Sequence, residues 1–524
     1  MSDTPDFVAH HRASDGAWQS LADHLSGVAG LASSFAAKLG LQDQGELLGL
    51  LHDLGKYSQA FQAYLKSATG ELNQDEDEDW VDAKSLRGKV DHSTAGAQFV
   101  WHALGSKTQN EQIAAQVLAL CVASHHSGLI DCIAADASNF GEDTFTKRMR
   151  KAQEKTHLGE VTNAAHALIL ERCVELLREA SLVSGFVQLM ESIGRNNTGA
   201  RATSAQVALQ QFGLLVRFLF SCLIDADRID TADFERQRTK RFRPSGVYVE
   251  WPVLVERMEF HLRGLTPRHP IDGLRRDISD HCRQAAERPG GIYTLTVPTG
   301  GGKTLASLRF ALHHAHMRNL DRIIYVIPFT SIIDQNAQVA RAVLEPYAAP
   351  GDHGKVVLEH HGSVTPEQQT WREKILCENW DAPVVFTTMV QFLESLFGAG
   401  TRGARRMHQL ANAVLIFDEV QTLPIKCVHL FNNAINFLAE HCNSTVVLCT
   451  ATQPLLQHVA KDKGAVRLAP QHELMRDVQD LFDRLKRVEV RDQRKPGGWT
   501  HDQVAELALT EVRRAGAYFG ERDR

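Results

Sequence analysis

Histidine and aspartate side chains recur through the first 230 residues in an order that could bind metal ions. The set consists of His24, His52, Asp53, His92, His125, His126 and Asp225. These residues lie on or beside predicted helices separated by long connections, and helical bundles collect metal ligands in this way. A single histidine on an apolar helix face is usually a buried core residue, so the prediction depends on the whole set. Two ions held close together could activate a water molecule and cut a phosphodiester.

A second group of residues has the chemistry of a triphosphate site. It consists of Thr299, Gly300, Gly301, Gly302, Lys303 and Thr304. The segment lies between an apolar run and a helical stretch, so backbone N–H groups would face the phosphates. Lys303 would neutralise their charge, and the Thr304 hydroxyl would reach Mg²⁺. Val297 stands where the strict pattern has Gly or Ala, which is a small departure.

Two carboxylates follow at long range and complete the expected nucleotide site. Asp418 and Glu419 come directly after the apolar run Val414 to Phe417, so both would lie at the C-terminal end of a strand. Asp418 would hold Mg²⁺ through water, and Glu419 would polarise the attacking water. An Asp-Glu pair after a strand is weak evidence for a nucleotide site by itself, but together with the phosphate loop it becomes strong evidence.

The elements that must position these two groups differ in kind. Residues 17 to about 243 have apolar positions at three- and four-residue steps, which predicts an all-α region. From about 270, short β-branched runs alternate with helical stretches, which predicts a parallel, doubly wound α/β sheet. The expected strands are 292–297, 323–327, 355–358, 384–386, 414–417 and 445–448. The predicted parts are a metal-binding domain (1–245), a linker (246–270), an ATP-binding domain (271–470) and an incomplete further part (471–524).

Length and composition agree with this division. A chain of 524 residues exceeds one hydrophobic core, and 43% hydrophobic with 23% charged residues is ordinary for a soluble protein. Nine dispersed cysteines without a CxxC pair favour a reduced cytoplasmic protein, and no apolar run predicts a membrane span. The net charge of −6 gives no global attraction to nucleic acid. Arg236 to Arg243 is the best local basic run, although a solvated helix end explains it equally well, and Asp75 to Asp79 reads as a solvated acidic loop.

The second half resembles the first RecA-like domain of superfamily 2 helicases. The matching motifs are PTGGGKT at 298–304, IPFTSIIDQ at 327–335, FTTMVQFLESL at 386–396, DEVQ at 418–421 and TAT at 450–452. The resemblance implies that Thr330, Ser331 and Thr387 lie near a nucleic-acid backbone. His360 and His361 follow a strand in this half, so we expect a structural or surface role for them.

The first half resembles the HD phosphohydrolase superfamily in the form found in HD nucleases. The resemblance implies one metal site from His24, His52, Asp53 and Asp225, and a second from Asp53, His92, His125 and His126. Asp53 would bridge two divalent transition metal ions, and imidazole-rich coordination favours Fe, Mn, Co or Ni. His52 and Asp53 would be catalytic. Lys56 could stabilise phosphate charge, or it could be a surface lysine with a solvated head.

An HD nuclease followed by such a helicase is similar to the CRISPR-associated helicase-nucleases of type I systems. That family implies a single-stranded DNA substrate, an RNA-guided surveillance complex as partner, and ATP with Mg²⁺. After TAT at 450–452 only 72 residues follow, without an arginine-bearing motif VI. We therefore expect a truncated, frameshifted or split product whose unwinding is weak unless another chain supplies a second RecA-like domain.

Two other interpretations remain open at this point. One is an HD phosphohydrolase acting on nucleotides, with the second half as an ATP sensor. The other is a non-catalytic remnant that binds DNA. Neither explains the helicase motifs that lie between the phosphate loop and TAT.

Overall fold

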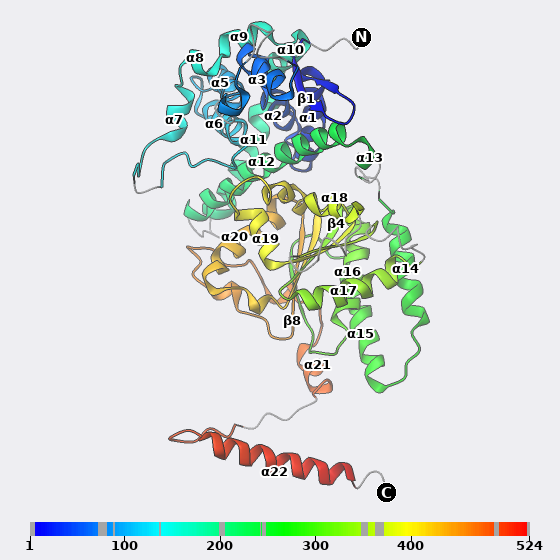
Figure 1. The fold of residues 1–524 in the computed structure, drawn as a ribbon. Coiled ribbons are helices and arrows are strands. Elements are labelled where there is room, and N and C mark those ends of the chain that lie inside the picture. The colour runs from blue at the N-terminus through cyan, green and yellow to red at the C-terminus, as the bar shows by residue number, and fades with distance from the viewer. Residues whose placement is uncertain are drawn as a thin grey trace. The chain divides into compact units, whose positions relative to one another are not determined.

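The structure is a computed structural model of the 524-residue chain. It describes residues 6–71, 81–86, 90–135, 138–198, 205–240, 243, 248–346, 355–361, 371–486 and 492–520. The acidic run 75–79 and part of the basic run 236–243 lie outside the described residues. The chain divides into two compact units, Met1–Val478 and Gln479–Arg524. Figure 1 shows the elements of each unit.

The first 240 residues are largely helical, as predicted, but they begin with a β-hairpin that the sequence did not indicate. Strands β1 (Val8–Arg12) and β2 (Ala17–Ser20) pair antiparallel. The longer helices are α1 (Leu21–Ala36), α2 (Gln42–Leu51), α3 (Gln59–Thr69), α5 (Ser93–Leu104), α6 (Gln109–Ser124), α10 (Ala167–Arg178), α11 (Ala180–Thr198) and α12 (Ala205–Glu235). The shorter helices include η2 (Leu54–Tyr57), α7 (Thr144–Met149) and α9 (Leu158–Ala164).

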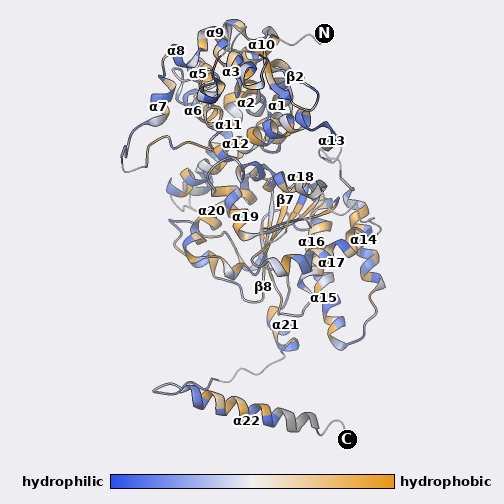
Figure 2. Ribbon diagram, viewed as in Figure 1, coloured by the Kyte–Doolittle hydropathy of each residue, from blue (hydrophilic) through white to orange (hydrophobic). Residues whose placement is uncertain are grey.

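Local sequence accounts for where the metal-bearing helices begin. The Ser20 side chain accepts a hydrogen bond from the Asp23 backbone N–H and caps α1. Thr108 and Glu111 form a capping box at the start of α6. Buried apolar residues of α1, α2, α6 and α12 pack together in the core, and Figure 2 shows apolar and polar residues alternating along these helices. Helices α1 and α6 are therefore fixed by a cap at the N-terminus and by the packing of their apolar faces.

The ATP-binding half contains a six-stranded parallel sheet, and the predicted doubly wound α/β fold is confirmed. The strands are β3 (Ile292–Thr296), β4 (Arg322–Ile327), β5 (Val357–His360), β6 (Val384–Thr388), β7 (Ala413–Asp418) and β8 (Thr445–Thr450). Their order in the sheet is β3-β8-β7-β4-β6-β5. The helices between them are α16 (Lys303–Arg318), α17 (Thr330–Leu344), α18 (Trp371–Asn379), α19 (Met389–Phe397) and α20 (Val428–His441). Since β3, β8 and β7 are neighbours, their carboxyl ends meet at one edge of the sheet.

The predicted linker 246–270 contains a packed helix. Helix α14 (Trp251–Gly264) buries Leu254 and Met258 and contacts α16 and α17. Its Glu259 forms two hydrogen bonds with Arg309 of α16, at 2.7 and 2.8 Å. This part of the segment therefore belongs to the ATP-binding half, together with α15 (Pro270–Ala285).

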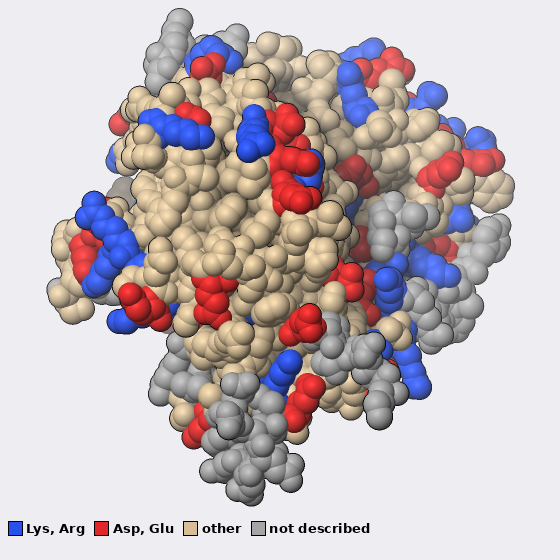
Figure 3. All heavy atoms as spheres, turned by 90° about the horizontal axis from the view of Figure 1, so that it is seen from above, with Lys and Arg blue, Asp and Glu red and all other residues tan. Residues whose placement is uncertain are grey.

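Helix α12 is long and apolar enough to cross a membrane, judged by length and composition alone. Of its most apolar window, 72% is buried inside the protein, as in the core helix of a folded domain. On the face seen in Figure 3, basic and acidic side chains are interspersed, so no patch of a single sign covers it. In the second unit, α22 (His501–Gly520) is the long helix; α21 (Val478–Arg484) begins at the last residue of the first unit.

Candidate metal centre and nucleotide site

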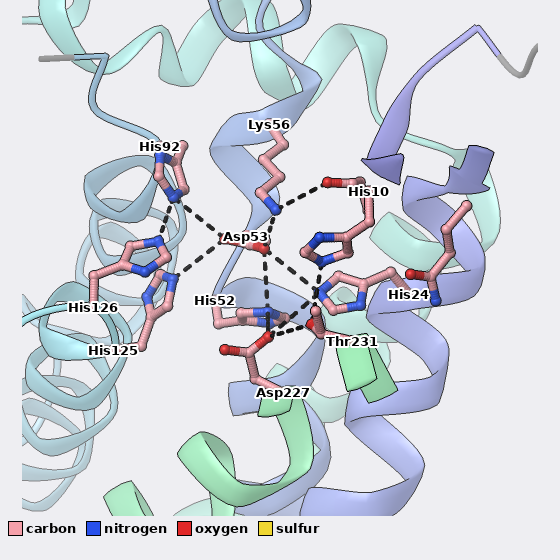
Figure 4. Close-up of polar contacts among 12 residues, drawn as sticks. His10, His24, His52, Asp53, Lys56, His92, His125, His126, Asp227 and Thr231 are labelled. Atoms are coloured by element: carbon pink, nitrogen blue, oxygen red, sulfur yellow. Dashed lines mark hydrogen bonds and ion pairs between the residues drawn. The ribbon is translucent and has the colours of Figure 1, made fainter. Parts of the chain in front are cut away.

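Asp53 lies at the centre of a cluster of imidazoles (Figure 4). It follows α2 directly, is 2% exposed, and its two carboxylate oxygens face different groups of histidines. The Oδ2 atom faces His24 and His52, and the Oδ1 atom faces His92 and His125. The predicted bridging position of Asp53 between two sets of ligands is therefore present in the fold.

The first set of ligands joins α1, the end of α2 and α12. Asp53 Oδ2 lies 3.5 Å from His24 Nε2 and 3.4 Å from His52 Nε2. Asp227 Oδ1 lies 3.7 and 3.8 Å from the same two nitrogens. Ligand atoms about 2.1 Å from one ion lie roughly 3 to 3.5 Å from one another. These four side chains fit one metal ion after small adjustments.

The second set of ligands joins the start of α5 to the end of α6. Asp53 Oδ1 lies 3.2 Å from His125 Nε2 and 3.6 Å from His92 Nε2. The Nε2 atom of His126 faces that of His92. The ligand atoms of all four residues lie within 4.8 Å of one another. His126 is exposed, so this set lies on the side from which a substrate can reach the centre.

The opposite ring nitrogens show which atoms are available to a metal. The Nδ1 atoms of His52 and His125 each donate to a backbone carbonyl at 2.8 Å, from Gly49 and Val122 respectively. Nδ1 of His24 donates to a carboxylate, so in its neutral form each of these three rings turns Nε2, the nitrogen that can bind a metal, toward the centre. The three Nε2 atoms and Asp53 Oδ1 are buried without a hydrogen-bond partner. Buried polar atoms left in this way fit a centre that binds metal ions.

Lys56 is buried beside the centre, so its interpretation as a solvated surface lysine is wrong. It is 5% exposed, and its Nζ lies 2.8 Å from Asp53 Oδ2. Burial alone would raise the pKa of the Asp53 carboxyl, but the Lys56 ammonium and the nearby imidazoles hold that pKa well below its usual range. Burial lowers the pKa of His92 to about 4 and that of His126 to about 3. Both groups are therefore neutral, as metal ligands must be.

The carboxylate that α12 contributes is Asp227, and the prediction of Asp225 was wrong. Asp225 is fully buried on another face of the helix, where its Oδ1 pairs with Arg405 at 2.9 Å and its Oδ2 with His408 at 3.0 Å. Residues two apart on a helix are rotated by about 200°, so the two aspartates face opposite ways. Asp225 therefore links the helical half of the chain to the half that contains the parallel sheet, and it does not face the candidate metal centre.

Two further residues at this centre were missed. His10 on β1 packs edge-on against His24. Burial, and to a smaller extent the charge of Lys56, lowers the pKa of His10 to about 2. Asp230 accepts the Nδ1 hydrogen bond of His24 at 2.7 Å. A signal for Asp230 was available, because residues three apart on a helix share a face and Asp227 and Asp230 have that spacing.

The nucleotide site lies at the carboxyl edge of β3, β8 and β7. Lys303 Nζ lies 2.5 Å from Glu419 Oε1 and 3.7 Å from Asp418 Oδ1. Glu419 is not a glycine yet adopts a left-handed backbone with φ of 51°, as residues at functional sites often do. Thr299, Gly300, Gly302, Lys303, Thr304 and Glu419 all line a cavity of about 870 Å³. The predicted phosphate loop and carboxylate pair are thus together.

The other helicase-like motifs lie at the same edge, with one correction. Thr450 donates to Gln421 at 2.6 Å, which joins TAT to DEVQ. Thr330 and Ser331 begin α17, where Thr330 is half-buried and Ser331 is exposed. Thr387 is completely buried and donates to the His360 carbonyl at 2.9 Å, so a direct contact with a nucleic-acid backbone is wrong for this hydroxyl. His361 lies 3.0 Å from Asp334, within an ion-paired group that includes Glu359.

The fold and the two sites define the class as an HD-type metal-binding domain followed by a RecA-like ATP-binding domain. Residues 9–190 match the family "Cas3, HD domain", and residues 284–459 match "DEAD/DEAH box helicase". The chain is 25% identical over 465 residues to "CRISPR-associated nuclease/helicase Cas3" of Haloferax volcanii, covering 81% of this chain and 47% of the relative. The chain thus combines a Cas3-type HD domain with a DEAD/DEAH-box helicase domain in the same polypeptide, and it is similar to Cas3 nuclease/helicases.

Solved structures agree with this fold. The crystal structure of T. fusca Cas3 with AMPPNP has a TM-score of 0.52 and 16% identity, covering 86% of this chain and 50% of that one. The structure of T. fusca Cas3 with ATP has a TM-score of 0.51 and 16% identity, covering 87% and 50%. The chain thus spans about half the length of the relatives it matches.

Proposed function

We propose that the chain is a metal-dependent nuclease acting on single-stranded DNA, joined to an ATP-dependent motor domain, in CRISPR antiviral defence in the cytoplasm. The observation that carries the proposal is the convergence of five histidines and two aspartates on one buried centre, with Asp53 between two ligand sets. The Cas3-type family matches and the helicase motifs support nucleic acid as the substrate. An RNA-guided surveillance complex is the partner we expect from the family.

The ligand chemistry limits the metals that the centre would take. Five imidazoles and two carboxylates favour Mn, Fe, Co or Ni over Mg²⁺, which prefers oxygen ligands. His24, His52, Asp53 and Asp227 would hold one ion, and Asp53, His92, His125 and His126 the other. When bound, such a pair of ions supplies an activated water and neutralises charge on the scissile phosphate.

The protein's own side chains would prepare the centre for a phosphodiester. Asp53 stays ionised because Lys56 lies 2.8 Å from Oδ2. The backbone carbonyls of Gly49 and Val122 hold the rings of His52 and His125 with Nε2 facing inward. A DNA strand would enter beside His126, the exposed member of the set. Lys56, whose ammonium is already at the centre, would offset phosphate charge.

A cleavage assay on single-stranded DNA tests the nuclease. We expect Mn²⁺-dependent cleavage by the unaltered chain and its loss in the His52→Ala/Asp53→Ala variant. Lys303→Ala is the matched control, because it removes the phosphate-binding lysine in the other half and should leave this cleavage intact. Equal cleavage by the double variant would refute the HD assignment. Phosphate release from free nucleotides without DNA cutting would instead favour the nucleotide phosphohydrolase.

For the ATP-binding half, we propose nucleotide binding at Lys303, Thr304, Asp418 and Glu419, with weak unwinding by residues 1–524 on their own. Helicases of this class hydrolyse ATP between two RecA-like domains, and an arginine from the second accelerates the reaction by ~10³ to 10⁵. The described part of the chain contains one parallel sheet of six strands. A strand-displacement assay with ATP checks this, and robust unwinding by these residues alone would contradict it.

A further inference from the structure

Asp230 differs from the other groups that support the metal-facing histidines. It lies one turn after Asp227 on α12, and its Oδ2 accepts from His24 Nδ1 at 2.7 Å. His52, His92 and His125 instead direct Nδ1 to backbone carbonyls. Among these four described imidazoles, His24 is thus the one supported by a carboxylate. Because a carboxylate carries a full charge, it strengthens the opposite nitrogen as a metal ligand.

Two residues hold the Asp230 carboxylate against His24. The Gln19 side chain at the end of β2 donates to Oδ2 at 2.8 Å, so one carboxylate oxygen accepts from both His24 and Gln19. The other oxygen lies against α1 at Gly27, where an added Cβ would be 2.3 Å from Oδ1 and 3.1 Å from Cγ. A side chain at position 27 would therefore displace Asp230 from His24.

The three atoms nearest to an added Cβ at Gly27 all belong to the Asp230 carboxylate. Gly27 lies inside α1, where glycine is less favourable than alanine by about 1 kcal/mol. Gly30, one turn later on the same helix, has no atom within 4 Å of its added Cβ. An added methyl group would therefore meet the Asp230 carboxylate at position 27 but not at position 30, and this difference can be tested.

We infer that Asp230, held by Gln19 and given room by Gly27, is a positioning residue that sets the affinity of the metal site formed by His24, His52 and Asp227. This inference rests on the proposed metal centre. It assigns Asp230 an effect on one of the two sites, because the His92, His125 and His126 rings have no contact with it among those described. Loss of such a partner weakens metal affinity by about 10- to 100-fold.

Equilibrium dialysis of the full chain with Mn²⁺, followed by elemental analysis, measures both sites. We expect the unaltered chain to bind two ions, and Asp230→Asn to keep one while its second binds about 10- to 100-fold more weakly. Glu235→Gln, an exposed carboxylate on the same helix, is the control and should match the unaltered chain. If Asp230→Asn binds both ions normally, or weakens both equally, the inference fails. If the unaltered chain binds no ion, the metal centre itself fails, and the role of Asp230 with it.

Melting temperatures separate positioning from mere stability. With a chelator, Asp230→Asn should melt close to the unaltered chain, whereas the rise in melting temperature on adding Mn²⁺ should be smaller. An equal fall with and without metal would assign Asp230 a structural role and overturn the inference.

The glycines provide an independent check. Gly27→Ala should weaken the same Mn²⁺ site, and Gly30→Ala should leave it unchanged. In an Asp230→Ala background, Gly27→Ala should add little further loss, because the carboxylate that the new methyl group would meet is gone. Full additivity of the two substitutions would contradict a shared role.

Discussion

At the scale of single residues, two aspartates on α12 have different surroundings and different expected roles. Asp227 faces His24 and His52, whereas Asp225 is enclosed by Arg405, His408 and Asn379. The same type of side chain thus faces the candidate metal centre at position 227 and forms half of a buried ion pair at position 225.

Substitution of Asp227 should change metal affinity and not stability, whereas substitution of Asp225 should change stability and not metal binding. We expect Asp227→Asn to lower Mn²⁺ affinity by at least about 100-fold and to abolish cleavage, with little change in the stability of the metal-free chain. Asp225→Ala leaves Arg405 without its carboxylate on α12, and breaking a buried pair costs about 3–5 kcal/mol. Asp225→Ala should therefore lower the free energy of unfolding, while each folded molecule still binds two Mn²⁺ ions. Metal content and denaturant unfolding of both variants measure this, and the reverse pattern would restore Asp225 as the ligand.

At the scale of elements, α12 connects the two chemical halves. Its Ser221 hydroxyl accepts from the His408 backbone, and its Arg217 donates to the carbonyls of Glu394, Ser395 and Gly398. Those carbonyls end α19, the helix that follows β6. Burial lowers the pKa of Arg217 to about 10, yet the guanidinium supplies donors that the end of α19 would otherwise lack.

Loss of this contact should destabilise the join between α12 and α19. Arg217→Met keeps most of the aliphatic volume but leaves the Ser395 and Gly398 carbonyls without the donor that Arg217 supplies, whereas the Glu394 carbonyl keeps its hydrogen bond from the Gly398 N–H. We therefore expect a loss on the order of 2 kcal/mol. Urea unfolding of the chelated chain measures it. Arg195→Met, at an exposed arginine on α11 with a surface ion pair, is the control and should change stability little. Equal effects of the two substitutions would argue against a specific join.

At the scale of the whole molecule, buried neutral histidines link stability to pH. Burial is the main cause that lowers the pKa of His408 and of His441 to about 4, and neither belongs to the metal centre. Unfolding exposes both imidazoles, whose ordinary pKa is 6.5. The unfolded chain therefore binds more protons between these values.

Stability should fall as the solution becomes more acidic. The contribution of these two histidines is fully present above pH 6.5 and is lost as the pH drops from 6.5 toward 4, by up to about 1.4 kcal/mol per pH unit for each. Urea unfolding of the chelated chain at pH 7 and pH 5 measures this. His441→Gln should make the dependence shallower by about one proton. A stability that is constant or rises at pH 5 would contradict the assignment.

The sequence by itself determined the kinds of chemistry and the fold of the ATP-binding half. Phosphate binding needs glycines, a lysine and a carboxylate pair at strand ends, and alternating strands and helices bring those ends to one edge, so local order was sufficient. Of the seven ligands predicted from the order of His and Asp residues, all except Asp225 lie together at the candidate metal centre.

Tertiary structure decided what depends on which way a helix faces. The choice of Asp227 over Asp225, the support of His24 by Asp230 and the burial of Lys56 all follow from α12 and the β1–β2 hairpin packing around α1 and α2. A helix carrying aspartates on several faces has several possible rotations, and neighbouring residues do not distinguish them. The rotation of α12 is selected only when one face is buried against α1 and the other against the ATP-binding half. The buried aspartates on each face then need partners on the element that covers them.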